Sequence, residues 1–163
     1  MKPIDQSIIH GNGLAGDCLR ACVASIFEIP IEEIPHFCDR HLDEKITNEN
    51  HCFTRINKWL SEKFGMSYLE VEFGNFGTYL IEKYGGYYIA TGPTDRFNGD
   101  VLHCVIYNGD KMIHDPHPSK SGLKTVYNIG IFILNDPVNY TSKIGMCQPA
   151  SLGEEDGTFP ENR

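Results

Sequence analysis

The sequence predicts an α+β protein in which N-terminal helices pack on a C-terminal antiparallel sheet. Apolar residues recur at helical spacing over much of residues 18–64, whereas residues 87–134 contain short runs typical of strands. An Asn-Gly pair at 108–109 separates two of these runs and favours a β-hairpin. Helices followed by hairpin-connected strands indicate an α+β chain rather than alternating βαβ units.

The 163 residues suit one domain with one hydrophobic core, which we assign to residues 1–135. Residues 136–163 are rich in Pro, Ser, Gly, Glu and Asn and contain few apolar side chains. Such a segment buries too little apolar surface to offset the entropy of ordering it. We therefore expect a loose acidic C-terminal tail.

Three helices are predicted. The first covers residues 18–27, directly after Asp17, which is a good N-cap residue. The second runs through residues 49–64, with Gly65 as its stop, and the third covers residues 75–84. The apolar stripes of the first two helices consist of Leu19, Cys22, Val23 and Ile26, and of Phe53, Ile56, Trp59, Leu60 and Phe64.

Strands follow from alternating or apolar runs bounded by turn residues. Residues 102–108 and 111–115 flank the hairpin signal and are expected to pair with each other. The complete set of expected strands is 67–73, 87–92, 102–108, 111–115 and 125–134.

Charge and composition exclude several functions. The net charge is −8 and the Lys and Arg residues are scattered, which argues against nucleic acid and against an anionic membrane surface. The sequence contains neither an apolar run long enough to span a bilayer nor the pattern of a signal peptide. We therefore expect a cytoplasmic protein whose six cysteines are free thiols, metal ligands or catalytic groups.

Cys18 is the first candidate for chemistry. It stands in the first turn of a predicted helix, where backbone N–H groups and the helix dipole lower a thiol pKa and stabilise an oxyanion. The alternative is a buried cysteine that packs as a small hydrophobe. Cys22 lies on the apolar stripe and is interpreted as packing, because a disulfide to Cys18 within one helical turn would need distorted geometry.

A nucleophilic thiol needs a base, and the base needs an acceptor that orients it. His103 begins one strand of the predicted hairpin and Asp115 ends the other. A two-residue turn at Asn108-Gly109 would put these two side chains on opposite faces. The chemistry therefore predicts an odd connection or a bulge, such as a three-residue loop 107–109 with a left-handed Gly109.

The stretches "GDCLRACVAS" and "HCVIY…HDP" resemble the papain-like thiol hydrolases, in particular the double-glycine leader peptidase domains of bacteriocin exporters. The stretch "ACVASIFEIPIEEIPHF" and the ending "HDPHPS" also resemble a group of small phage and bacterial proteins, which carry the pattern "ACxASxxxxPxxxVPxF". The resemblance covers roughly residues 5–124 and preserves the order Cys, His, Asp. It implies a papain-like fold.

The resemblance also implies roles for individual residues. Cys18 would be the nucleophile, His103 the general base and acid, and Asp115 the acceptor that fixes the imidazole tautomer. Asp17 matches the Asp of the Asp-Cys pair that opens the helix in these relatives. In the leader peptidases a Gln six residues before the Cys helps to form the oxyanion hole. Asn12 holds that position here and Gln6 is the nearby Gln, so either amide is a candidate.

Two further residues are candidates for substrate contacts. Arg96 lies in the stretch "GPTDRFNGD", which is either a solvated turn or a wall of the site that binds polar groups of a substrate. His114 and His117 flank Asp115 in "HDPHPS", which is either a proline-rich turn or a loop that faces the substrate. For His117 the structural turn is the favoured interpretation.

A metal site between the first two helices is an alternative use of the histidines and cysteines there. The candidate ligands there are His36, Cys38, His41, His51 and Cys52. Their spacing fits no paired-ligand pattern for zinc, so surface histidines and buried cysteines are the preferred interpretation and no metal is expected.

The predicted function is a cysteine hydrolase that cleaves a peptide, isopeptide or other amide bond through an acyl-enzyme and without a cofactor. The resemblance suggests a phage accessory protein that acts on a host protein, a peptide or a small amide conjugate in the host cytoplasm. Acyl transfer to an amine is an alternative outcome of the same chemistry. An alternative from another class is a non-catalytic binding protein that sequesters a host factor or nucleotide signal. The sequence leaves the oligomeric state open.

Overall fold

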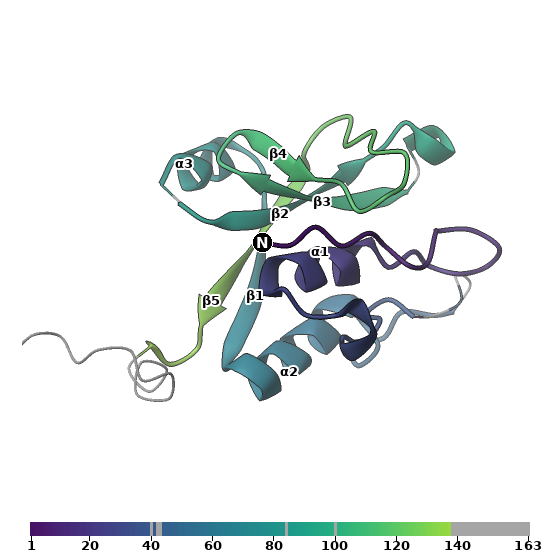
Figure 1. Cartoon of the computed structure of the whole chain (residues 1–163), viewed down its shortest axis with the longest axis horizontal. Helices are drawn as coiled ribbons and strands as arrows, with labels where there is room; N and C mark the ends of the chain where they lie inside the picture. The colour runs from purple at the N-terminus through teal and green to yellow at the C-terminus, as the bar shows by residue number, and fades with distance from the viewer. Residues whose placement is uncertain (40, 42–43, 84, 100, 138–163) are drawn as a thin grey trace, which may run out of the picture.

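The computed structural model describes residues 1–39, 41, 44–83, 85–99 and 101–137. Its helices are α1 (Cys18–Phe27), α2 (Cys52–Phe64) and α3 (Asn75–Lys83), with 3₁₀ turns at Ile31–Glu33 and Arg96–Gly99. Its strands are β1 (Met66–Glu72), β2 (Tyr87–Pro93), β3 (Leu102–Asn108), β4 (Lys111–His114) and β5 (Asn128–Leu134). Three helices and an antiparallel sheet confirm the predicted α+β class (Figure 1).

The strands form one open sheet in the order β1-β5-β2-β3-β4, and every neighbouring pair is antiparallel. Helix α1 packs on β3 and β2, and α2 packs on β1. Helix α3 lies on the other face, where Ile81 packs against a second buried cluster, which includes Tyr88, Ala90 and Val105. Strand β2 is therefore covered on both faces, and six of its seven residues are buried.

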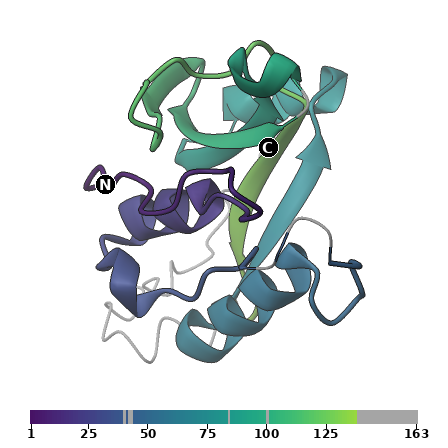
Figure 2. The same ribbon diagram turned by 90° about the vertical axis from the view of Figure 1, so that its right-hand side faces the viewer.

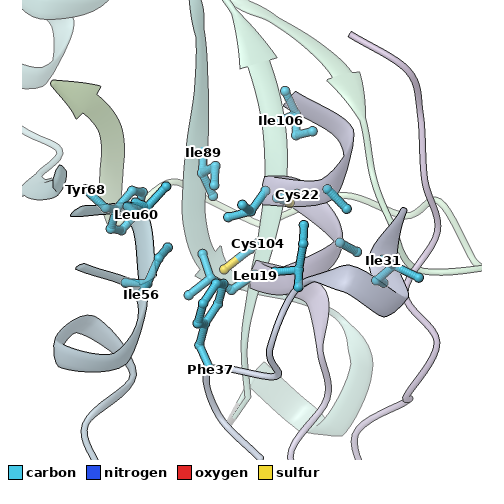
Figure 3. Packing of buried hydrophobic residues seen from close by; sticks show 14 residues of the cluster. Leu19, Cys22, Ile31, Phe37, Ile56, Leu60, Tyr68, Ile89, Cys104 and Ile106 are labelled. Carbon is cyan, nitrogen blue, oxygen red and sulfur yellow. The ribbon is translucent and has the colours of Figure 1, made fainter. Parts of the chain in front are cut away.

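The main core lies between α1, α2 and the sheet (Figure 3). The predicted stripe of α1 is confirmed, since Leu19, Cys22 and Val23 are buried there. In α2, Ile56 and Leu60 are fully buried, and the aromatic members of the predicted stripe pack partly buried around them. Helical periodicity thus identified the buried faces of both helices.

Two boundaries differ from the sequence prediction by three residues, and the ends of β1, β2 and β4 differ by one. Helix α2 starts at Cys52 rather than near residue 49, because His51 acts as its N-cap and accepts a hydrogen bond from the N–H of Phe53 through its side chain. Strand β5 starts at Asn128 rather than 125. The residues before Asn128 run beside β2 without regular strand pairing. One hydrogen bond joins them to β2, from the N–H of Tyr127 to the carbonyl of Thr91 at 2.8 Å.

The hairpin between β3 and β4 contains the predicted odd residue, but at a different place. Asn108 pairs with Lys111 across a two-residue turn in which Gly109 has a φ of +59°, so the expected three-residue loop is wrong. The register then shifts, because Tyr107 pairs with Met112 whereas Ile106 pairs with His114.

The extra residue is therefore Ile113, and the irregularity is a bulge in β4, the edge strand of the sheet. Edge strands tolerate bulges because only one side of the strand carries a ladder. The shift lets His114 turn inward, where it is buried. It also brings Asp115, which directly follows the strand, to the face of His103.

The N-terminal segment runs between α1 and the β3–β4 side of the sheet (Figures 1 and 2). The N–H of Ile4 donates to the Ser25 hydroxyl of α1 at 2.9 Å. On the other side, the N–H of Gln6 donates to the carbonyl of Pro116 at 3.0 Å. These contacts hold the N-terminal segment to α1 on one side and to the residues after β4 on the other. They place Gln6 beside the start of α1.

Candidate active site

Cys18 is the first residue of α1 and is partly buried. Asp17 occupies the N-cap position, but its side chain does not cap the helix, which corrects the sequence prediction. Its buried carboxylate instead accepts hydrogen bonds from the N–H of Ile8 at 2.8 Å and the hydroxyl of Ser7 at 2.6 Å. The N-terminal segment therefore takes the carboxylate away from the helix, and the N–H groups of the first turn receive no cap from Asp17.

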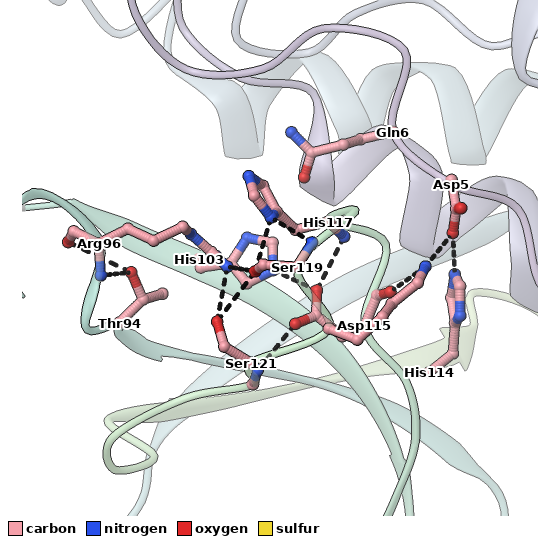
Figure 4. Close-up of polar contacts among 12 residues, drawn as sticks. Asp5, Gln6, Thr94, Arg96, His103, His114, Asp115, His117, Ser119 and Ser121 are labelled. Carbon is pink, nitrogen blue, oxygen red and sulfur yellow. Dashed lines mark hydrogen bonds and ion pairs between the residues drawn. The ribbon is translucent and has the colours of Figure 1, made fainter.

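His103 and Asp115 form a buried pair. His103 Nε2 donates to Asp115 Oδ1 at 2.7 Å, and the two residues are only 5% and 3% exposed. The same carboxylate accepts from the backbone N–H of His117 and from that of Gly122, each at 2.8 Å (Figure 4). Asp115 is thus held by three donors, and it fixes the tautomer of His103 with the Nε2 proton toward itself.

Because Nε2 of His103 is bound to Asp115, the other ring nitrogen, Nδ1, is available for the hydrogen bond with Cys18. Hydrogen bonding with Cys104 is the largest influence on Cys18 and lowers its pKa, burial raises it, and the hydrogen bond and charge of His103 lower it further. The net pKa of Cys18 lies well below the ordinary value of 9.0. A thiolate is therefore the favoured state of Cys18.

The pKa of His103 moves the opposite way. Burial is the largest single influence and lowers it, but hydrogen bonds to Asp115 and Cys18 and the charges of both groups raise it to about 9. Burial raises the pKa of Asp115, and the hydrogen bonds from His103, His117 and Gly122 overcome this and hold it below its ordinary range. These shifts favour a thiolate, an imidazolium and a carboxylate in series.

Cys104 is a site residue that the sequence analysis missed. It is buried, its thiol contacts Thr91 Oγ1 at 3.6 Å, and it exchanges a hydrogen bond with Cys18. That hydrogen bond and burial raise the pKa of Cys104 well above 9.0, so it remains the protonated partner of the Cys18 thiolate. Only its position next to His103 in the sequence hinted at this role.

A cavity of about 360 Å³ opens beside Cys18 and His103. Its walls come from the N-terminal segment, the starts of α1 and α2, strands β1, β2 and β3, and the loops that carry Cys38, Arg96 and His117. Many of its side chains are apolar. Ile9 and Leu102 line it and are 43% and 51% exposed, so they form an apolar rim. An arrangement of this kind can hold an acyl group against the sulfur.

The structure separates the other predicted site residues. Gln6 and Arg96 line the cavity. Asn12 does not line it but lies exposed in a tight turn closed by hydrogen bonds between Gly11 and Leu14. His114 is also outside it, because its Nε2 donates to the carbonyl of Ile4 at 2.9 Å and secures the N-terminal segment.

His117, for which a structural turn was favoured, lines the cavity. Its ring stands edge-on to that of His103, with 6.0 Å between the ring centroids. Burial, followed by the positive charges of Arg96 and His103, lowers the pKa of His117. It is therefore neutral at neutral pH and shields one side of the His103 ring.

Within the described part of the chain, no group of three or more His, Cys, Asp or Glu side chains is arranged to hold a metal ion. Cys38 and Cys52, two of the candidate metal ligands, both line the cavity. None of the described helices combines the length and apolar character needed to cross a membrane.

Fold and site together define an α+β protein with a Cys-His-Asp arrangement at the mouth of a largely apolar cavity. Comparisons with protein-family models, curated proteins and solved structures found no match.

Proposed function

We propose that the chain is a cysteine hydrolase with a papain-like fold, which cleaves an amide, peptide or isopeptide bond. The observation that carries this proposal is the continuous series from Cys18 through His103 to Asp115, with the pKa of the thiol lowered and that of the imidazole raised to about 9. An imidazole oriented by a buried carboxylate activates a nucleophile, and a cysteine that only packs in a core does not require one.

The reaction has two halves. The Cys18 thiolate attacks the carbonyl carbon, and the new oxyanion is stabilised by the N–H groups at the start of α1. Collapse of this intermediate breaks the C–N bond, and His103 gives its proton to the departing amine. His103 then takes a proton from water, which attacks the thioester, releases the acid and restores the thiolate.

The experiment is a search for a thioester on Cys18. The full chain is incubated with a cell extract, and adducts are located by mass spectrometry before and after treatment with hydroxylamine, which cleaves thioesters. We expect an adduct at Cys18 that hydroxylamine removes and that Cys18→Ala abolishes. Cys147→Ala is the matched control and keeps the adduct.

One result would contradict the proposed hydrolase activity. An alkylating reagent such as iodoacetamide that labels Cys18 no faster than Cys104, together with no adduct from the extract, would refute the hydrolase. That result would favour the non-catalytic binding protein.

A further inference from the structure

The carboxamide of Gln6 carries a feature that the proposed reaction does not use. Gln6 is only 9% exposed, and its Nε2 donates to the carbonyl of Ile8 at 2.8 Å. Its Oε1 is buried and has no hydrogen-bond partner among the described residues. Figure 4 shows this carboxamide extending toward the rings of His103 and His117, with its oxygen on their side.

The orientation of this amide follows from its surroundings. Turning it over would place Oε1 against the carbonyl of Ile8, so that two acceptors would face each other and a hydrogen bond would be lost. The backbone of Gln6 is itself tied to Pro116. The atom that Gln6 leaves without a partner is therefore an acceptor, Oε1.

A buried acceptor without a donor is unfavourable, and buried polar groups in native proteins nearly always have a partner. Gln6 lines the same cavity as Cys18. The missing donor is therefore expected on the molecule that occupies this cavity.

His117 provides a complementary group in the cavity. Its Nδ1 accepts a hydrogen bond from the N–H of Ser119 at 3.0 Å. In the neutral ring the proton must then lie on Nε2, which makes His117 a donor in the cavity that Gln6 lines with an acceptor. One acceptor and one donor match the N–H and C=O of a secondary amide.

We propose that Gln6 determines specificity: its Oε1 accepts a hydrogen bond from an N–H group of the substrate. The site then prefers substrates that carry an amide N–H near the reacting carbon, such as peptidyl groups, over ester analogues. This inference rests on the proposed hydrolase, because it concerns the molecule presented to Cys18.

The test uses two alkylating reagents of nearly equal size, N-methyl-2-iodoacetamide and methyl iodoacetate. The first has an N–H group where the second has an ester oxygen. In both, the thiolate displaces iodide from the same carbon. The labelling rate of Cys18 with each reagent is divided by the rate of glutathione with that reagent, which removes the difference in intrinsic reactivity. In the parent protein we expect the amide to be favoured by about 3- to 10-fold, the effect of one hydrogen bond.

Gln6→Met removes the acceptor and should bring this ratio close to one. Leu69→Met introduces the same residue at an exposed position of β1 outside the cavity and should keep the parent ratio. Circular dichroism reports whether each variant folds. If Gln6→Met does not fold, the measurement on the parent protein is sufficient. A normalised amide-to-ester ratio of one in the parent overturns the proposal.

The outcomes separate the two proposals. Preferential labelling of Cys18 with the same amide preference in the parent and in folded Gln6→Met overturns the role of Gln6 and leaves the hydrolase intact. Labelling of Cys18 no faster than that of Cys104 overturns the hydrolase itself.

Discussion

Replacing Asp115 by Asn tests the electrostatics of the site most directly. The carboxylate is 3% exposed and accepts from His103 Nε2 and from the N–H groups of His117 and Gly122. An asparagine side chain of the same shape has one acceptor oxygen and one donor nitrogen. At least one of the three donors must then face an N–H group instead of an oxygen.

Two magnitudes follow from this geometry. A buried donor without an acceptor costs about 1–3 kcal/mol, so the free energy of unfolding of Asp115→Asn should fall by about that amount. Removing a negative charge in direct contact with an imidazolium lowers the imidazole pKa by about 1 unit or more. The pKa of His103 should therefore drop clearly below the value of about 9 in the parent.

The difference in stability between parent and variant should depend on pH in a defined way. The raised pKa of His103 contributes stability that is complete below the unfolded value of 6.5 and is lost as pH rises through about 9. The lowered pKa of Asp115 contributes stability that is present above 3.8 and is lost as pH falls below it. The difference should be largest between about pH 4 and pH 6.5 and shrink on both sides.

Urea denaturation at pH 5.5 and pH 9.5 measures this difference, and NMR titration of the imidazole measures the pKa of His103. Asp95→Asn is the matched control, because that side chain is 79% exposed and its ion pair with Lys124 lies at the surface. If the His103 titration is the same in Asp115→Asn and the parent, Asp115 is not its electrostatic partner and the reasoning fails.

Four further predictions concern the core, the thiol of Cys18, the close approach at Gly92 and the tail. Cys22 is fully buried, so Cys22→Ser should lower the free energy of unfolding by about 1–3 kcal/mol. Equal melting temperatures for Cys22→Ser and the parent would contradict the core assignment. Cys18→Ala should instead abolish activity with little loss of stability. A Cβ at Gly92 would lie 2.0 Å from the carbonyl oxygen of Thr125, so Gly92→Ala should lower the free energy of unfolding by about 1–3 kcal/mol through overpacking. Urea denaturation measures this loss, and an unchanged midpoint would disprove the close approach. Truncation after Ser151 removes a polar acidic segment, so alkylation of Cys18 should proceed at the parent rate, and a large loss would mean that the tail contributes to the site.

The sequence alone determined the elements and the order of the reactive groups. Apolar periodicity and turn residues predict the helix that starts at Cys18 and the end of α2 before Gly65. They also predict the strand that carries His103 and the strand that Asp115 directly follows. These signals act over a few residues, so they can be recognised without the rest of the chain. The predicted tail falls on residues 136–163, most of which lie outside the described residues, and it stays a prediction.

Only the tertiary structure decided how these groups meet. The odd residue of the hairpin was foreseen, but its place at Ile113 depends on the edge position of β4 and on the inward turn of His114. Side chains alternate along a strand, so a register change of one residue reverses every facing side chain, and local sequence does not encode where it occurs.

The same holds for the groups that surround the sulfur. The contact of Cys104 with Cys18, the loss of Asp17 as a cap and the entry of Gln6 and His117 into the cavity join segments far apart in the chain. Each is decided by competition between hydrogen-bond partners that only folding brings within reach, as when Ser7 and the N–H of Ile8 take the carboxylate of Asp17 from its own helix.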